Sequence, residues 1–121
     1  MVCNMVSLTP PRANRLHGLP VIDLSGDLDC YNAPALRERL FKMIENGEHD
    51  LVLDLSGVSY LDSVGVATLV AVHENVSARN GSLRVLCANR AIWRVFEITG
   101  LQRVFPIFQE RTALVSSLDA K

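Results

Sequence analysis

The chain has 121 residues, of which 49% are hydrophobic and 21% are charged, and its formal net charge is −1. This size and composition are typical of one globular domain with its own core. The near-neutral charge argues against a nucleic-acid partner, and no apolar run approaches the roughly 20 residues of a membrane helix. Residues 1–11 lack the basic start and apolar stretch of a signal peptide. We therefore expect a cytoplasmic domain without membrane contact.

Cysteine and histidine usage indicates no metal site and no disulfide framework. Cys3, Cys30 and Cys87 have no close spacing, and an odd number of cysteines argues against a disulfide framework. Cys87 lies within a predicted strand, where we expect it to be buried as a small hydrophobe. Cys30 lies in a predicted loop, and a redox role for it stays open. The scattered histidines are expected to be ordinary side chains, so we predict no metal and no cofactor.

The first half of the chain predicts strands alternating with a helix. Residues 2–8 are a weak candidate for an edge strand, and the proline-rich residues 9–18 predict a loop. Residues 19–25 alternate between apolar and polar, which predicts a half-buried strand ended by Gly26. An acidic loop follows. Asn32 is predicted to cap a helix that has Pro34 in its first turn and ends at Asn46 and Gly47.

The second half continues the alternation. Residues 50–55 are almost continuously apolar, which predicts an interior strand with parallel neighbours. Residues 56–61 are predicted to form a loop, and Asp62 is predicted to cap a long helix over 63–80, ended by Gly81. The remaining elements are a strand over 83–87, a helix over 90–99, an edge strand over 104–108 containing Pro106, and a helix over 110–118. Trp93 is expected in the core with Phe96 and Val104.

This order predicts the α/β class. Strands that alternate with helices form a sheet with right-handed crossovers. We expect one domain over residues 1–121, with its core over about 19–118. The sheet is expected to be mixed, with about four to five strands and about four helices.

The segment over residues 54–65 reads Asp-Leu-Ser-Gly-Val-Ser-Tyr-Leu-Asp-Ser-Val-Gly. Together with Gly-Asp-Leu-Asp at 26–29 and Phe-Glu-Ile-Thr-Gly-Leu at 96–101, it resembles the STAS domain. Sulphate transporters and anti-sigma-factor antagonists share this domain. The resemblance extends from about residue 19 to residue 118, and it implies the same α/β fold.

The resemblance also implies a function and partners. In that family, an antagonist binds an anti-sigma factor that is also a serine kinase, and the binding releases a sigma factor. The kinase phosphorylates the serine that follows the aspartate at the start of the long helix, which blocks binding until a serine phosphatase removes the phosphate. The motif places this phosphoacceptor at Ser63. Many antagonists carry a second serine or threonine where this chain has Val64, so Ser63 stands alone.

The residues themselves support a switch at this position. The first turn of a helix has unpaired N–H groups and the positive end of the helix dipole, and Asp62 can cap those groups. Ser63 is expected to face solvent or a partner. A phosphate adds a charge of about −1.5 to −2, which the dipole attracts and nearby carboxylates repel. We therefore expect the fold to survive phosphorylation and the partner interface to be lost.

A partner surface is predicted around Ser63. We expect the acidic loop to lie beside the start of the long helix, because both follow the carboxyl ends of strands. One face of the long helix is expected to pack on the core, and a flatter face of small residues is either covered by neighbouring elements or open to a partner. The predicted partner-binding residues are Asp27, Asp29, Tyr31, Asp62, Val64, Gly65, Ala67, Thr68 and Ala71.

Other functions are less consistent with the sequence. Asp27, Asp29 and Asp62 do not have the spacing of a defined metal loop, and turn or capping roles are the default for them. Leu61 precedes the Asp-Ser-x-Gly element where a nucleophile elbow has glycine, and no phosphate-binding glycine loop is present, so we predict no enzyme. A STAS module without phosphorylation, in a stress-signalling complex or serving an anion transporter, stays open, as does the oligomeric state, a monomer or weak dimer.

Overall fold

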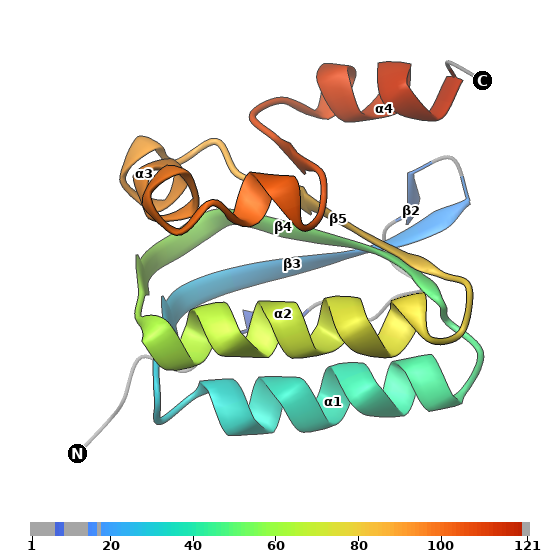
Figure 1. Cartoon of the computed structure of the whole chain (residues 1–121), viewed down its shortest axis with the longest axis horizontal. Coiled ribbons are helices and arrows are strands. Elements are labelled where there is room, and N and C mark those ends of the chain that lie inside the picture. Colours follow the sequence, from blue (N-terminus) through green and yellow to red (C-terminus); the bar gives the residue numbers. More distant parts are fainter. Residues whose placement is uncertain (1–6, 9–14, 17, 120–121) are drawn as a thin grey trace.

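A computed structural model describes residues 7–8, 15–16 and 18–119 (Figure 1). The elements are, in chain order, β1 (Ser7–Leu8), β2 (Arg15–Leu16), β3 (Leu19–Leu28), α1 (Ala33–Glu45), β4 (Asp50–Leu61), α2 (Ser63–Ser77), β5 (Ser82–Leu86), α3 (Arg90–Thr99), a 3-10 turn (Leu101–Arg103), β6 (Ile107–Phe108) and α4 (Arg111–Asp119). The alternating α/β order is therefore confirmed. Most of the edge strand predicted over residues 2–8 lies outside the described residues, and Ser7–Leu8 is its described part.

The sheet is mixed, as expected. Its order is β1-β3-β4-β5-β6, and β2 also pairs with β3. Strands β3, β4, β5 and β6 are parallel to one another, whereas the two-residue strands β1 and β2 are antiparallel to β3. The sheet over the described residues thus has one strand more than the upper expectation, because part of the predicted loop over 9–18 pairs as β2. The last strand lies at an edge, as predicted, but it spans only Ile107–Phe108, so Pro106 precedes the strand instead of lying within it.

Helices cover both faces of the sheet. In Figure 1, α1 and α2 lie side by side under one face, and α4 lies on the opposite side. Leu51, Leu53 and Leu55 of β4 point into the main core, whereas Val52 belongs to a smaller cluster with Leu114 of α4. The apolar run over residues 50–55 is thus buried on both faces, and the prediction of an interior strand is confirmed.

Two predicted strand ends are wrong. β3 does not end at Gly26 but continues to Leu28, and residues 56–61 are not a loop but the second half of β4. Gly26 adopts φ 95°, a conformation that glycine tolerates, and the pairing of β3 with β4 shifts register on both sides of Ser25 and Gly26. The two strands therefore stay paired up to Leu28 and Leu61, and they carry both chain segments to the start of α2.

The predicted end of the long helix is also corrected. α2 ends at Ser77 rather than near Asn80, and Asn80 has φ 61°, the left-handed conformation that often follows a helix. Gly81 is needed for a different reason. A Cβ atom at this position would collide with the backbone carbonyl of His49.

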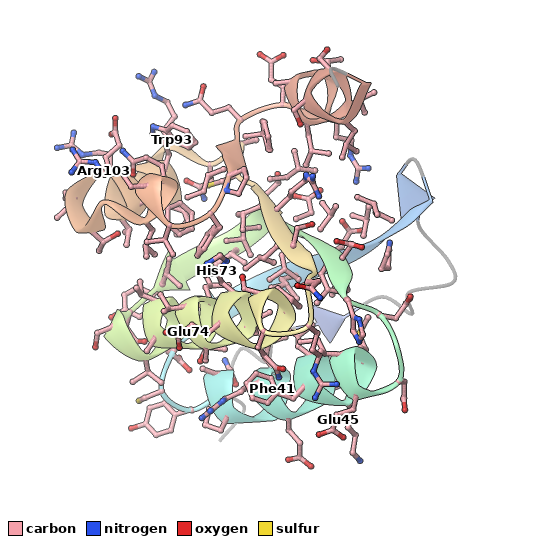
Figure 2. The ribbon with its side chains drawn as sticks, turned by 45° about the vertical axis from the view of Figure 1, so that its right-hand side comes forward. Phe41, Glu45, His73, Glu74, Trp93 and Arg103 are labelled. Carbon is pink, nitrogen blue, oxygen red and sulfur yellow. The ribbon has the colours of Figure 1, made fainter. Side chains whose placement is uncertain are left out.

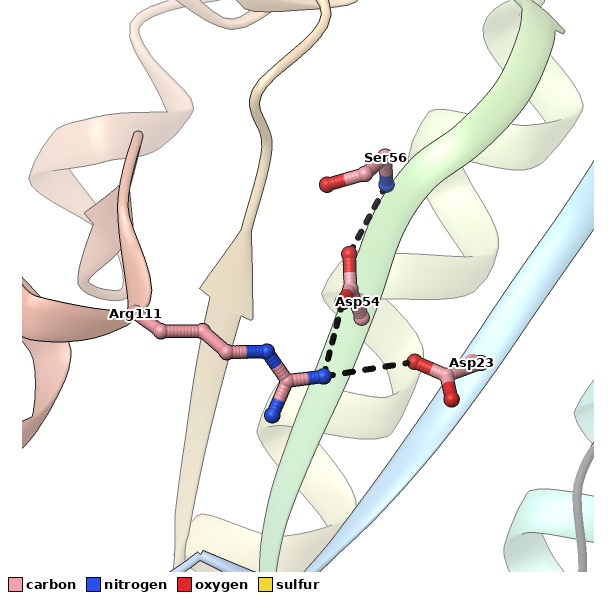
Figure 3. Close-up of polar contacts among 4 residues, drawn as sticks. All are labelled: Asp23, Asp54, Ser56 and Arg111. Atoms are coloured by element: carbon pink, nitrogen blue, oxygen red, sulfur yellow. Dashed lines mark hydrogen bonds and ion pairs between the residues drawn. The ribbon is translucent and has the colours of Figure 1, made fainter. Parts of the chain in front are cut away.

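An arginine connects α4 to the sheet (Figure 3). The Arg111 guanidinium donates to Asp54 Oδ2 at 3.2 Å and lies 3.8 Å from Asp23 Oδ1. The two aspartates are register partners on β3 and β4, and Asp54 Oδ1 also accepts the Ser56 N–H. The positive charge therefore offsets the repulsion between the two carboxylates and fixes the start of α4 over them.

Cys87 is buried, as predicted. Its thiol donates to the Asn89 carbonyl oxygen, and burial raises the pKa of the Cys87 thiol to about 11. The thiol is therefore protonated at neutral pH and acts as a small hydrophobe. In contrast, Cys30 is exposed. Trp93 is half-buried and packs against the main core, which contains Phe96, whereas Val104 is exposed, so only the expected packing of Val104 in the interior is wrong.

Candidate partner-binding site around Ser63

Ser63 is the first residue of α2, and its side chain is exposed. It follows the carboxyl end of β4, next to the carboxyl end of β3, because these strands are parallel neighbours. This is the edge at which parallel α/β sheets place their binding sites. The hydroxyl is thus accessible to another protein.

Asp62 fixes the backbone on both sides of this position. Its Oδ1 accepts the N–H groups of Val64 at 2.9 Å and of Gly65 at 3.0 Å, so the predicted N-cap is confirmed. Its Oδ2 accepts the N–H of Cys30 at 3.1 Å. One carboxylate therefore caps α2 and also attaches it to the loop after β3, which confirms that this loop lies beside the start of the helix.

Replacing Asp62 with alanine is expected to lower the free energy of unfolding by about 1–2 kcal/mol, the usual cost of losing an N-cap. Urea denaturation followed by circular dichroism measures the change. Asp62→Asn keeps an acceptor oxygen and should lose less, and Ser63→Ala, one residue further on, should change the stability little. An Asp62→Ala variant as stable as the parent would contradict the capping role.

The loop after β3 is organised by Asp29 rather than by Asn32. Asp29 Oδ1 accepts the N–H groups of Tyr31 and Asn32, both at 3.0 Å. Asn32 makes no side-chain cap, which corrects the prediction; its amide instead donates to the Asp27 carbonyl oxygen at 2.8 Å. Asp27 and Asp29 are both half-buried, and the Asp29 carboxylate of the acidic loop is used to hold the turn.

The face of α2 expected to meet a partner is narrower than predicted. Gly65 is buried, and a Cβ there would collide with the Leu28 carbonyl oxygen, so this glycine serves packing within the chain. Thr68 is 5% exposed and its hydroxyl donates to the Val64 carbonyl oxygen. Ala67 is exposed and Ala71 is half-buried. Gly65 thus lies on the side of α2 expected to pack on the core, and of the flatter face Thr68 is covered while Val64 and Ala67 are exposed.

Exposed apolar side chains lie in the segments that adjoin Ser63. Tyr31 is 79% exposed, Tyr60 is 52% exposed and Val64 is 39% exposed. Tyr31 follows Cys30, which is bonded to Asp62, and Tyr60 precedes the last residue of β4. Sequence reasoning missed Tyr60 because residues 56–61 were expected to be a loop. The apolar residues Val58 and Leu61 on either side of it were the sequence signal that β4 continues past this position. We call Tyr31, Tyr60, Ser63, Val64 and Ala67 the switch surface.

A groove of about 470 Å³ adjoins the switch surface. It lies between α1 and α2, and its lining residues are Pro34, Arg37, Glu38, Phe41, Lys42, Glu45, Val64 and Thr68. The Arg37 guanidinium lies 4.9 Å from the centroid of the Phe41 ring. Figure 2 shows Phe41 and Glu45 on α1 at this side of the molecule. Cations and anions are balanced in the groove, so its charge favours no particular ligand.

Two further observations concern the described part of the chain. No three histidine, cysteine, aspartate or glutamate side chains within it are placed to hold a metal ion. None of its helices is long and apolar enough to cross a membrane. The candidate site thus consists of the exposed Ser63 hydroxyl at the capped start of α2, together with the exposed apolar side chains of the switch surface.

An α/β domain that presents a serine in this way has the form of a regulatory binding module. Residues 10–113 match the STAS domain family, and the chain belongs to that family. The resemblance noted in the sequence is thus confirmed.

Relatives and solved structures point to one branch of the family. The chain is 37% identical over 86 residues to the anti-sigma-B factor antagonist of Bacillus subtilis, which covers 71% of this chain and 78% of that protein. It is 36% identical to the anti-sigma-B factor antagonist of Staphylococcus aureus over 67% of this chain and 75% of that protein. Its fold is similar to the crystal structure of an anti-sigma factor antagonist from Mycobacterium paratuberculosis, with a TM-score of 0.78, 27% identity, and 95% and 93% of the two chains covered.

Proposed function

We propose that this protein is an anti-sigma-factor antagonist that binds an anti-sigma factor through the switch surface and so releases a sigma factor. The observation that carries the proposal is the exposed Ser63 at the capped start of α2, with the exposed Tyr31, Tyr60 and Val64 in the adjoining segments. The relatives named as anti-sigma-B factor antagonists support it. The anti-sigma factor is also the serine kinase that phosphorylates Ser63, and a serine phosphatase reverses the reaction.

The switch acts through charge at an apolar interface. A phosphate on Ser63 brings about −1.5 to −2 charges into the middle of the switch surface. The start of α2 tolerates this charge, since the helix dipole favours an anion there by about 0.3–1 kcal/mol. A bound partner would bury the phosphate between tyrosine and valine side chains, where no described cation lies on the switch surface to pair with it. The fold is thus kept while the complex is destabilised.

Incubation with the anti-sigma factor kinase and ATP tests the proposal. The intact mass should increase by one phosphate, and fragmentation should place the phosphate on Ser63. Ser63→Ala should abolish the increase, whereas Ser59→Ala, which removes another exposed hydroxyl before α2, should leave it unchanged. A phosphate that persists in the Ser63→Ala variant would place the switch elsewhere, and an unmodified parent chain that still binds the partner would identify a binding module without phosphorylation.

A further inference from the structure

Helix α4 covers a small apolar face of the sheet. Val21 of β3, Val52 of β4 and Leu86 of β5 are buried there and form one cluster with Leu114 of α4. In Figure 1, α4 lies on the side of the sheet opposite α1 and α2, and one chain segment joins it to β6. The face beneath α4 is therefore separate from the groove between α1 and α2.

This face consists of two neighbouring rows of side chains. Val21 and Val52 are register partners, and so are Asp23 and Asp54, two residues further along each strand. Since side chains two residues apart on a strand point to the same face, an apolar row and an acidic row lie side by side under α4. Arg111 of α4 contacts the acidic row, and the buried leucine of α4, three residues later, contacts the apolar row. One face of the helix thus matches both rows.

The attachment of α4 is small compared with that of the longer helices. Of its described side chains, Leu114 alone is buried, and Leu118 is partly buried against the same cluster. In contrast, α2 buries Gly65, Thr68, Leu69, Val72 and Val76. α4 has 9 residues, too few for a helix that is stable alone in water. Its helical hydrogen bonds therefore depend on contact with the sheet.

The charged contact is accessible to dissolved ions. The Arg111 and Asp23 side chains are 45% and 41% exposed, and that of Asp54 is 14% exposed. Raising the salt concentration from about 0.1 M to about 1 M shortens the Debye length from about 10 Å to about 3 Å. Screening weakens the attraction of Arg111 in the closed state, and it also weakens the repulsion between the two aspartates that remains after Arg111 leaves. Both changes favour release of α4.

We propose that α4 is a salt-sensitive strap that opens as a unit about the exposed residues Gln109 and Glu110 while the sheet stays folded. Opening uncovers the apolar row and the acidic row together, on the side of the sheet away from the groove. β6 stays in place, because the Cys87 N–H donates to the Phe108 carbonyl oxygen at 2.7 Å. The strap is a device separate from the proposed switch at Ser63.

Hydrogen–deuterium exchange of the whole protein, followed by mass spectrometry, tests this inference. The α4 amides should exchange faster than the α2 amides. Raising sodium chloride from about 0.1 M to about 1 M should accelerate α4 exchange by about two- to fivefold, the effect of an exposed ion pair, and leave α2 exchange unchanged. Arg111→Gln should accelerate α4 exchange by a similar factor at low salt and remove its salt dependence. Arg103→Gln removes the same charge at an exposed position outside α4 and should change neither.

A buried thiol separates opening of the strap from unfolding of the whole domain. Val52→Cys places a thiol beneath α4, and Val72→Cys places one in the main core, both in a chain that also carries Cys3→Ser and Cys30→Ser. The thiol of Val52→Cys should react with a maleimide faster than that of Val72→Cys, and still faster at high salt. The inference is overturned if the two thiols react at the same rate, if α4 and α2 amides exchange only together, or if neither salt nor Arg111→Gln changes α4 exchange.

Discussion

An Ala67→Arg variant is expected to bind the anti-sigma factor at least about a hundredfold more weakly, with a nearly unchanged melting temperature. Ala67 is exposed and lies one turn after Ser63 on α2. A long charged side chain there would be buried without a counter-charge when the partner binds, and about 2.7 kcal/mol of that cost corresponds to a hundredfold in affinity. In the free protein the same side chain extends into water.

Titration calorimetry with the purified anti-sigma factor measures the affinity, and thermal unfolding measures the stability. Ala78→Arg is the matched control, because Ala78 is exposed at the other end of the same helix. Ala71 is half-buried, so Ala71→Arg is expected to lower the melting temperature as well and is a poorer probe. Unchanged affinity in a folded Ala67→Arg variant would remove this face of α2 from the interface.

A Gly65→Ala variant is expected to lose about 2 kcal/mol of folding stability, although alanine is the better helix former by about 1 kcal/mol. The added Cβ would collide with the carbonyl oxygen of Leu28 and lie 2.6 Å from Leu61 Cδ1. The carbonyl belongs to the paired end of β3, so relief requires α2 to move away from the sheet. The crowding therefore outweighs the gain in helix propensity.

Urea denaturation measures this loss as a lower midpoint. Ser63→Ala serves as the control, because it changes an exposed position of the same first turn. A Gly65→Ala variant with equal or higher stability would show that the helix and the strand end are not in close contact. Because the collision displaces the first turn of α2, the variant should also be a poorer substrate for the kinase.

Features specified by local sequence were predictable. The alternation over residues 19–25 and the aspartate before a helical run identify a strand and a capped helix start, since both signals depend on neighbours in the chain. The motif around Ser63 added the family, which is confirmed, and the proposal that Ser63 is the phosphoacceptor. The capping role of Asp62 was therefore predictable from sequence. The hydrogen bonds that its side chain accepts from the N–H groups of Val64 and Gly65 confirm it.

Features specified by distant residues were missed. The continuation of β4 beyond Ser56 depends on pairing with β3, and the local Ser-Gly-Val-Ser sequence favours a turn. The contact of Arg111 with Asp54 joins residues 57 positions apart. Tyr60 belongs to the switch surface only because β4 continues to Leu61. Thr68 does not belong to this surface because it is buried where it lines the groove between α1 and α2.

The attachment of α2 to β3 has a consequence for the timing of the signal. Asp62 holds Cys30, and Gly65 lies against Leu28, so the first turn of the helix is fixed to the sheet from two sides. In the proposed switch, phosphorylation would change the chemistry of the surface without a slow rearrangement of the backbone, which in switch proteins takes microseconds to seconds. The proposed switch would accordingly have a response time set by the turnover of its kinase and phosphatase and by dissociation of the complex.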